Sequence, residues 1–175
     1  MIMSIEFLIL DFIQDYIKNP VFDFIIPKVT VLGNAGIIWI VVAVVMLCIP
    51  KYRKNGIALA TGLIACLLLG NLFLKPLVAR VRPFDVAEGI KLLIAAPTDF
   101  SFPSGHIYSS VVGAYVLSKT DKRFGYVAIP LAVLIAFSRL YLYVHYPTDI
   151  LGGILLGGLI SVVLHFVFFK KKRLT

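Results

Sequence analysis

Three short clusters of polar side chains stand out in an otherwise apolar sequence, each at an end of an apolar segment. They are Lys75 with Arg82-Pro83, then Pro103-Ser104-Gly105-His106, and then Ser138-Arg139 with His145 and Asp149. Ionisable groups at membrane depth are costly, so they usually mark functional sites. Three cations combined with two imidazoles predict a phosphate-binding site that contains an acid–base or nucleophilic pair.

The last two clusters contain further groups that suit this chemistry. Asp149 follows His145 by four residues, and a carboxylate beside a histidine fixes its tautomer and stabilises its cation. Ser104 follows a proline, and serine is a preferred residue at the start of a helix. Backbone N–H groups at such a start, including that of Gly105, have no partner within the helix and attract anions. We therefore expect a helix to begin beside the phosphate.

The rest of the sequence is typical of an integral membrane protein. Of the 175 residues, 60% are hydrophobic and 15% are charged, and the mean hydropathy is +0.97. Apolar segments long enough to cross a bilayer recur along the chain. We predict an all-α membrane bundle in a single domain, residues 1–175, with transmembrane spans at residues 33–50, 56–74, 104–118, 124–143 and 150–169. No connection between these spans is long enough to form a separate soluble domain.

The first nineteen residues differ from these spans. Polar side chains recur on one face of residues 1–19 and apolar ones lie largely opposite, which predicts an amphipathic helix in the membrane interface. The alternative is a sixth span, which would bury Glu6, Asp11 and Asp15. Pro27 is expected to interrupt the apolar stretch before the first span.

The distribution of charge predicts the orientation in the membrane. With five spans, the loops around residues 51–54 and 118–125 share one side with the tail at 170–173, and this side holds ten of the seventeen basic residues and one of the nine acids. The positive-inside rule places this side, with the C-terminus, in the cytoplasm, and the three clusters together on the non-cytoplasmic face. The net charge of +8 is then a signal of topology and of lipid headgroups. It does not indicate nucleic-acid binding, because the basic residues flank spans.

The order and spacing of the clusters resemble the three-part motif of the type 2 phosphatidic acid phosphatase superfamily. This superfamily includes membrane lipid phosphatases and the soluble vanadium haloperoxidases. Six residues separate Lys75 from Arg82-Pro83, five separate Arg139 from His145, and three separate His145 from Asp149. Every motif position between residues 75 and 149 matches, and a three-part match is far more specific than a single short motif.

The resemblance implies hydrolysis of a phosphate ester or diphosphate through a phosphohistidine, with no metal and no cofactor. His145 would be the nucleophile, Asp149 its orienting carboxylate, and His106 the acid that protonates the leaving oxygen. The remaining motif residues would hold the phosphoryl oxygens, and they are Lys75, Arg82, Ser104, Gly105 and Arg139.

The family and the predicted topology together favour one substrate. Undecaprenyl diphosphate, which is recycled on the outside of bacterial membranes, is the first expectation, and phosphatidylglycerol phosphate or phosphatidic acid is the alternative. A small transporter or channel is the alternative from a different class. Such a protein needs charges spread through its spans, whereas here the charges gather at one rim.

A few other residues carry expectations of their own. Arg80 lies outside the motif and is interpreted as an anchor at the membrane surface. Asp85, Glu88 and Asp99 are interpreted as solvated acids of the Phe84–Phe102 loop, and this loop is a candidate gate for the substrate. A seam of glycines in the last span, at residues 152–153 and 157–158, permits close helix packing within the bundle or in a homodimer.

Overall fold

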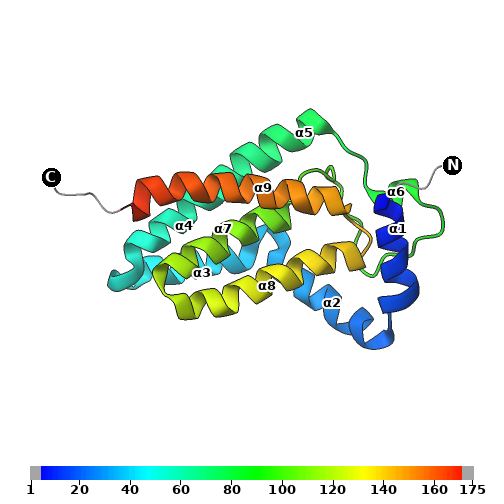
Figure 1. The fold of residues 1–175 in the computed structure, drawn as a ribbon, viewed down its shortest axis with the longest axis horizontal. Coiled ribbons are helices and arrows are strands. Elements are labelled where there is room, and N and C mark those ends of the chain that lie inside the picture. The colour runs from blue at the N-terminus through cyan, green and yellow to red at the C-terminus, as the bar shows by residue number, and fades with distance from the viewer. Residues whose placement is uncertain (1–4, 171–175) are drawn as a thin grey trace.

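The computed structural model describes residues 5–170, and this part of the chain is helical, with no strand. The helices form an elongated bundle in which α7 (Gly105–Thr120) packs against α8 (Lys122–Tyr141), α9 (Pro147–Leu164) and α4 (Arg53–Ala65) (Figure 1). Helix α3 (Ile37–Cys48) packs along α4, and α2 (Pro20–Gly33) packs against α8. The predicted all-α membrane bundle is therefore confirmed.

The remaining elements are short. Helix α4 continues through a π-helical stretch, Cys66–Leu74, into α5 (Lys75–Val78), and α9 continues in the same way through His165–Phe169. The other elements are α1 (Ile5–Phe12), a π-helical turn at Ile13–Ile17, 3₁₀ turns at Asn34–Gly36 and Pro50–Tyr52, and α6 (Pro83–Val86).

Within residues 5–170, four helical stretches are long and apolar enough to cross a membrane. They are Pro20–Cys48, Pro50–Val86, Lys122–Tyr141 and Pro147–Phe169. Helix α7 has 16 residues and lies at the centre of the bundle, where many of its side chains are buried. The outer surface is covered with large apolar side chains, as a lipid-facing surface requires.

The first spanning stretch differs from the sequence-based expectation. Helix α2 runs through Pro27 without ending, and Asn19 caps its start by accepting hydrogen bonds from the N–H groups of Val21 and Phe22, both at 3.0 Å. The chain breaks instead at Asn34–Gly36, where Ala35 and Gly36 have φ angles of 49° and 68°. Proline is tolerated inside spanning helices, whereas left-handed backbone ends the helical hydrogen-bond ladder.

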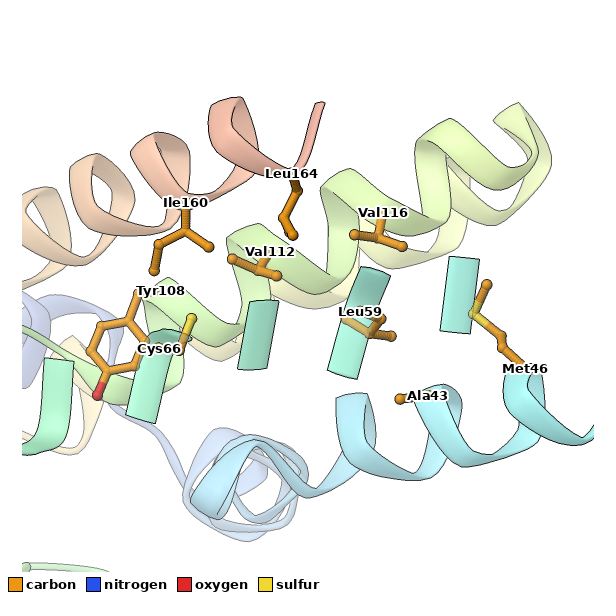
Figure 2. Packing of buried hydrophobic residues seen from close by; sticks show 9 residues of the cluster. All are labelled: Ala43, Met46, Leu59, Cys66, Tyr108, Val112, Val116, Ile160 and Leu164. Atoms are coloured by element: carbon orange, nitrogen blue, oxygen red, sulfur yellow. The ribbon is translucent and has the colours of Figure 1, made fainter. Parts of the chain in front are cut away.

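The largest buried apolar cluster joins four helices at the middle of the bundle (Figure 2). Side chains from α3, α4, α7 and α9 meet in it, and its members are Ala43, Met46, Leu59, Cys66, Tyr108, Val112, Val116, Ile160 and Leu164. The glycine seam of α9 serves this packing, because a Cβ at Gly157 would lie 2.7 Å from the carbonyl oxygen of Tyr108 on α7. Gly158 is different, since a Cβ there would meet no atom of the described chain within 4 Å.

The N-terminal segment lies across one end of the bundle, where α1 stands beside the start of α9 (Figure 1). Its polar side chains turn toward the protein. The Tyr143 hydroxyl donates a hydrogen bond of 2.6 Å to Asp11, and the Gln14 amide donates one of 2.8 Å to the carbonyl oxygen of Tyr141. Ile5 and Phe12 are exposed. Leu10 and Ile13 are buried as well, so this segment contacts the bundle with both polar and apolar side chains.

Candidate active site

The three polar clusters meet at one end of the bundle. Helix α5 begins at Lys75, α7 begins at Gly105, α8 ends just after Arg139, and α9 begins just before Asp149. These helix ends lie on the same side of the molecule as α1 and α6 (Figure 1). The alternation of direction along the bundle thus brings together residues that are far apart in the sequence.

His145 and Asp149 form a buried pair. The Nδ1 atom of His145 lies 3.2 Å from Oδ2 of Asp149, and both side chains are almost fully buried. The same carboxylate accepts hydrogen bonds from the hydroxyl of Ser101 and, at 2.9 Å, from the backbone N–H of Tyr146. Asp149 therefore also closes the first turn of α9. With Nδ1–H donated to the carboxylate, the lone pair of His145 is on Nε2.

The His145 ring is held neutral at physiological pH. Burial lowers the pKa of His145, its hydrogen bond to Asp149 raises it, and the nearby charges of Arg139 and Arg82 lower it again, so that the pKa lies well below its usual value. A neutral imidazole with an unprotonated Nε2 is the nucleophilic form of histidine.

Arg82 occupies the space in front of this nitrogen. Its Nη1 lies 3.2 Å from Nε2 of His145 and donates a hydrogen bond of 2.6 Å to the carbonyl oxygen of Val144. Its Nε donates to the backbone carbonyl of Asp99 at 2.8 Å, and its Nη2 lies 2.6 Å from Oδ1 of the same residue. Lys75 forms an ion pair with the other oxygen of Asp99. The interpretation of Asp99 as a solvated loop acid is therefore wrong, because its carboxylate joins two motif cations.

Arg139 and Ser104 each keep one unused polar atom. The Nη1 of Arg139 donates a hydrogen bond of 2.6 Å to the hydroxyl of Thr30 on α2. Within residues 5–170, the Nε of Arg139 and the Oγ of Ser104 are buried and have no hydrogen-bond partner. Ser104 precedes the first residue of α7, as predicted, but its hydroxyl does not cap the helix. Buried polar groups without partners are rare and costly, and here they fit a site that receives an anion.

His106 lies beside the break between α2 and α3. Its Nε2 is 3.0 Å from the amide oxygen of Asn34, so this nitrogen carries a proton when the ring is neutral. The backbone of Gly33 passes directly beside the ring, because a Cβ there would lie 2.4 Å from Cδ2 of His106. The break in the first spanning stretch thus positions His106 through the side chain of Asn34 and the backbone of Gly33.

Arg80 forms ion pairs within the protein. The interpretation of Arg80 as an anchor at the membrane surface is therefore also wrong. Its Nη1 lies 2.8 Å from Oδ1 of Asp149, and its Nη2 lies 2.6 Å from Oε2 of Glu6 on α1. The guanidinium also lies over the Tyr146 ring, 3.9 Å from its centroid. Arg80 therefore ties the N-terminal helix to the carboxylate that orients His145.

A cavity of about 980 Å³ joins the polar site to an apolar groove on the side of the bundle. At its polar end the lining residues include Lys75, Arg82, Asp99, His106, Arg139 and His145. Its apolar part runs between α3 and α4 and is lined by Ile40, Ala43, Val44, Leu47, Leu63, Ile64 and Leu67. The cavity thus has a cationic end and an apolar end. A lipid with a charged headgroup and a hydrocarbon chain would match both parts.

The positive charge of the site comes from side chains. The described part of the chain, residues 5–170, has no group of three or more His, Cys, Asp or Glu residues placed to hold a metal ion. Lys75, Arg82 and Arg139 are all buried here, and their charges converge on the polar end of the cavity. Such preorganised cations stabilise the spread negative charge of a transferring phosphoryl group.

Known proteins resemble this chain along most of its length. An undecaprenyl-diphosphatase of Sulfolobus acidocaldarius is 38% identical over 125 residues, which are 71% of this chain and 60% of that protein. Phosphatidylglycerophosphatase B of Bacillus subtilis is 33% identical over 173 residues, covering 90% of this chain and 80% of that protein. The chain thus spans less than two thirds of the first relative but most of the second.

A solved structure has the same arrangement of helices. The crystal structure of a transmembrane PAP2 type phosphatidylglycerolphosphate phosphatase from Bacillus subtilis matches with a TM-score of 0.70 and 28% sequence identity, covering 98% of this chain and 96% of the other. The sequence model of the PAP2 superfamily matches residues 55–173, which include all three clusters. With its long apolar helices, the chain is a multi-pass membrane protein, and it belongs to the PAP2 superfamily.

Proposed function

We propose that this protein removes a terminal phosphate from a membrane lipid through a phosphohistidine, and that its substrate is undecaprenyl diphosphate. One observation carries the proposal most directly. The His145 ring lies between Asp149 and Arg82, beside two further cations, in a cavity that continues into an apolar groove. The charges gather at one end of the bundle, which favours an enzyme over a transporter or channel.

In the proposed first step, Nε2 of His145 attacks the terminal phosphorus. A bond forms between nitrogen and phosphorus while the bond from phosphorus to the leaving oxygen breaks. His106 acts here as the doubly protonated imidazolium and gives the proton on Nδ1 to that oxygen, which leaves a neutral ring with its Nε2 proton still facing Asn34. Asp149 stabilises the positive charge that develops on the His145 ring. Lys75, Arg82, Arg139, the Ser104 hydroxyl and the Gly105 N–H stabilise the phosphoryl oxygens.

In the second step, water attacks the phosphohistidine. His106 now lacks its proton and accepts one from the attacking water, which regenerates the acid for the next cycle. The bond between His145 and phosphorus breaks, and inorganic phosphate leaves the site. Both His106 and His145 line the cavity, and they are held by different partners, Asn34 and Asp149, which supports this division of roles.

The choice of lipid rests on the relatives and on the groove. The Sulfolobus acidocaldarius relative is named for undecaprenyl diphosphate, and an apolar groove between α3 and α4 suits the start of a long hydrocarbon chain. Phosphatidylglycerol phosphate is the second candidate, because the alignment with the Bacillus subtilis phosphatidylglycerophosphatase covers more of this chain and more of its relative. Both lipids end in a phosphate that the site can bind.

The test is phosphate release by the purified protein from the two lipids in the same detergent. A higher kcat/KM for undecaprenyl diphosphate than for phosphatidylglycerol phosphate supports the first choice, and the reverse order makes the second lipid the substrate. Acid-labile, base-stable labelling of the protein by a substrate with a radioactive terminal phosphate would identify the phosphohistidine. A protein that releases phosphate from neither lipid would contradict the proposal.

The proposal includes the side of the membrane. The excess of basic residues at the opposite end of the bundle supports a site on the non-cytoplasmic face and a cytoplasmic C-terminus. In a variant that lacks the exposed Cys48, an impermeant thiol reagent should label Lys91→Cys in intact cells and should leave Lys54→Cys unlabelled. Lys91 and Lys54 are both exposed, at opposite ends of the bundle. The reverse labelling pattern would overturn this orientation.

A further inference from the structure

Asp99 occupies the position that the proposed function assigns to the phosphate. One carboxylate oxygen forms an ion pair with Lys75, and the other lies 2.6 Å from Nη2 of Arg82. The Asp99 side chain is 53% exposed, whereas those of Lys75 and Arg82 are only 7% and 3% exposed. A half-exposed loop carboxylate thus neutralises two buried cations at the mouth of the cavity.

The Asp99 carboxylate stays ionised throughout the working range. Burial raises the pKa of Asp99, but its hydrogen bonds and ion pairs with Lys75 and Arg82 have the larger, opposite effect and lower the pKa to about 2. A phosphate group can bind these cations fully only when it displaces the carboxylate. Asp99 also holds Arg82 through its backbone carbonyl, at 2.8 Å from Nε, so this exchange reorganises the residue in front of His145.

The charge of an incoming phosphate group decides whether it can displace the Asp99 carboxylate from Lys75 and Arg82. Bulk phospholipid headgroups are phosphodiesters with one negative charge on phosphorus, and the exchange with Asp99 then replaces one single charge by another. Asp99 has the advantage of being tethered, since a tethered group competes at a high effective concentration. A terminal phosphate carries between one and a half and two charges at neutral pH, so its attraction to the two cations is larger.

We propose that Asp99 is a specificity-determining residue whose carboxylate fills the phosphate site in the empty enzyme, so that lipids with a terminal phosphate enter and phosphodiester lipids do not. This inference rests on the proposed function, because it takes Lys75 and Arg82 as phosphate ligands. It gives the Phe84–Phe102 loop a defined task. The loop carries the competing carboxylate, and the substrate must exchange with it in each turnover.

The test compares Asp99→Asn with Glu88→Gln. Both changes remove one negative charge from the same loop, but Glu88 is exposed and forms no ion pair within the described residues. Inhibition by phosphatidylglycerol, a phosphodiester, is measured in mixed micelles with a water-soluble aryl phosphate as the substrate. We expect Asp99→Asn to lower the inhibition constant of phosphatidylglycerol by a factor of roughly 5–30, as two ion pairs of this kind imply. Glu88→Gln should leave it unchanged.

Two further readouts separate specificity from a structural role. The inhibition constant of inorganic phosphate should also fall in Asp99→Asn, and both KM and kcat for the substrate should fall, because the product phosphate leaves more slowly. Asp99→Glu restores the charge and should restore most of the discrimination. A merely structural role would lower kcat in Asp99→Asn without tightening the binding of either inhibitor, and that result would overturn the inference.

A binding measurement keeps this test independent of catalysis. Thermal stabilisation of the wild type and of Asp99→Asn by inorganic phosphate is compared with stabilisation of Lys75→Met by the same ligand. Stronger stabilisation of Asp99→Asn than of the wild type, lost in Lys75→Met, supports the inference even if neither candidate lipid is hydrolysed and the proposed substrates fail. Equal stabilisation of the wild type and Asp99→Asn would contradict it.

Discussion

Arg80 and Asp149 form an ion pair, with 2.8 Å between Nη1 and Oδ1, on the side of the carboxylate that faces away from His145. The other oxygen of Asp149 binds His145, Ser101 and the N–H of Tyr146. Arg80 is not part of the three-part motif, yet its charge contacts the same carboxylate as His145, the proposed nucleophile. It therefore acts on His145 through Asp149, as a positioning residue.

Replacing Arg80 by glutamine should shift the pH dependence of the reaction. Without the Arg80 charge, the Asp149 carboxylate attracts a proton on His145 more strongly, so the pKa of His145 should rise. The acid limb of kcat/KM should therefore move to higher pH, while Arg80→Lys should keep most of the original profile. The measurement is kcat/KM for an aryl phosphate between pH 4 and 9. Arg123→Gln, at the exposed opposite end of the bundle, is the control, and equal profiles for both glutamine variants would contradict this role.

The wild type should itself remain active at acidic pH. Burial and the charges of Arg139 and Arg82 lower the pKa of His145, against the opposing effect of Asp149, so the ring stays in its neutral, attacking form below the usual histidine pKa of about 6.5. The acid limb of kcat/KM should therefore lie below pH 6.5, after correction for the substrate's second ionisation near about pH 6. An acid limb with a midpoint above pH 7 would mean that the site does not depress this pKa.

The two histidines should give different defects. His145→Ala removes the nucleophile, so it should form no phosphoenzyme and lose roughly four to six orders of magnitude in kcat. His106→Ala removes the acid, which matters most for a poor leaving group. It should fail on the lipid but keep part of its activity on an activated aryl phosphate. Quench-flow detection of the phosphoenzyme checks both variants, and a phosphoenzyme in His145→Ala would reverse the two roles.

A methyl group at Gly33 should act specifically through His106. Its Cβ would lie 2.4 Å from Cδ2 of the ring, so the ring must move away from the amide of Asn34. Gly33→Ala should therefore lower kcat on the lipid more than on an activated aryl phosphate, and overpacking should lower the free energy of unfolding by roughly 1–3 kcal/mol. Gly158→Ala is the matched control, because its Cβ would meet no described atom within 4 Å. Equal losses on both substrates would argue against a specific effect on the acid.

The sequence predicts the meeting of the motif residues because their positions follow from span direction alone. Lys75, Ser104, Arg139 and Asp149 each lie at a span end, and an even number of crossings returns the chain to the same face. This reasoning needs only hydrophobicity and charge. The sequence also predicts that His145 and Asp149 are neighbours, because only three residues separate them at the start of the last span.

The contacts that the sequence does not predict depend on loops and on distant pairs. Asp99 looks like any polar loop residue, and 24 positions of largely irregular chain, interrupted by the short helix α6, separate it from Lys75. Arg80 pairs with Glu6 and Asp149, which lie 74 and 69 positions away. The hydrogen bond between His106 and the amide oxygen of Asn34 depends on a left-handed break at Ala35 and Gly36. The sequence instead favours Pro27 as the place where the helix is interrupted. None of these contacts has a local pattern.

The break between α2 and α3 also limits the transfer of the motif into another protein. Thr30 and Asn34, which hold Arg139 and His106, precede residue 55, where the match to the PAP2 superfamily begins. A chimera that joins residues 55–173 to the N-terminal part of another membrane protein would keep every motif residue. It would nevertheless leave one guanidinium and one imidazole without the neighbours that hold them, so a working site needs more of this chain than residues 55–173, which match the superfamily model.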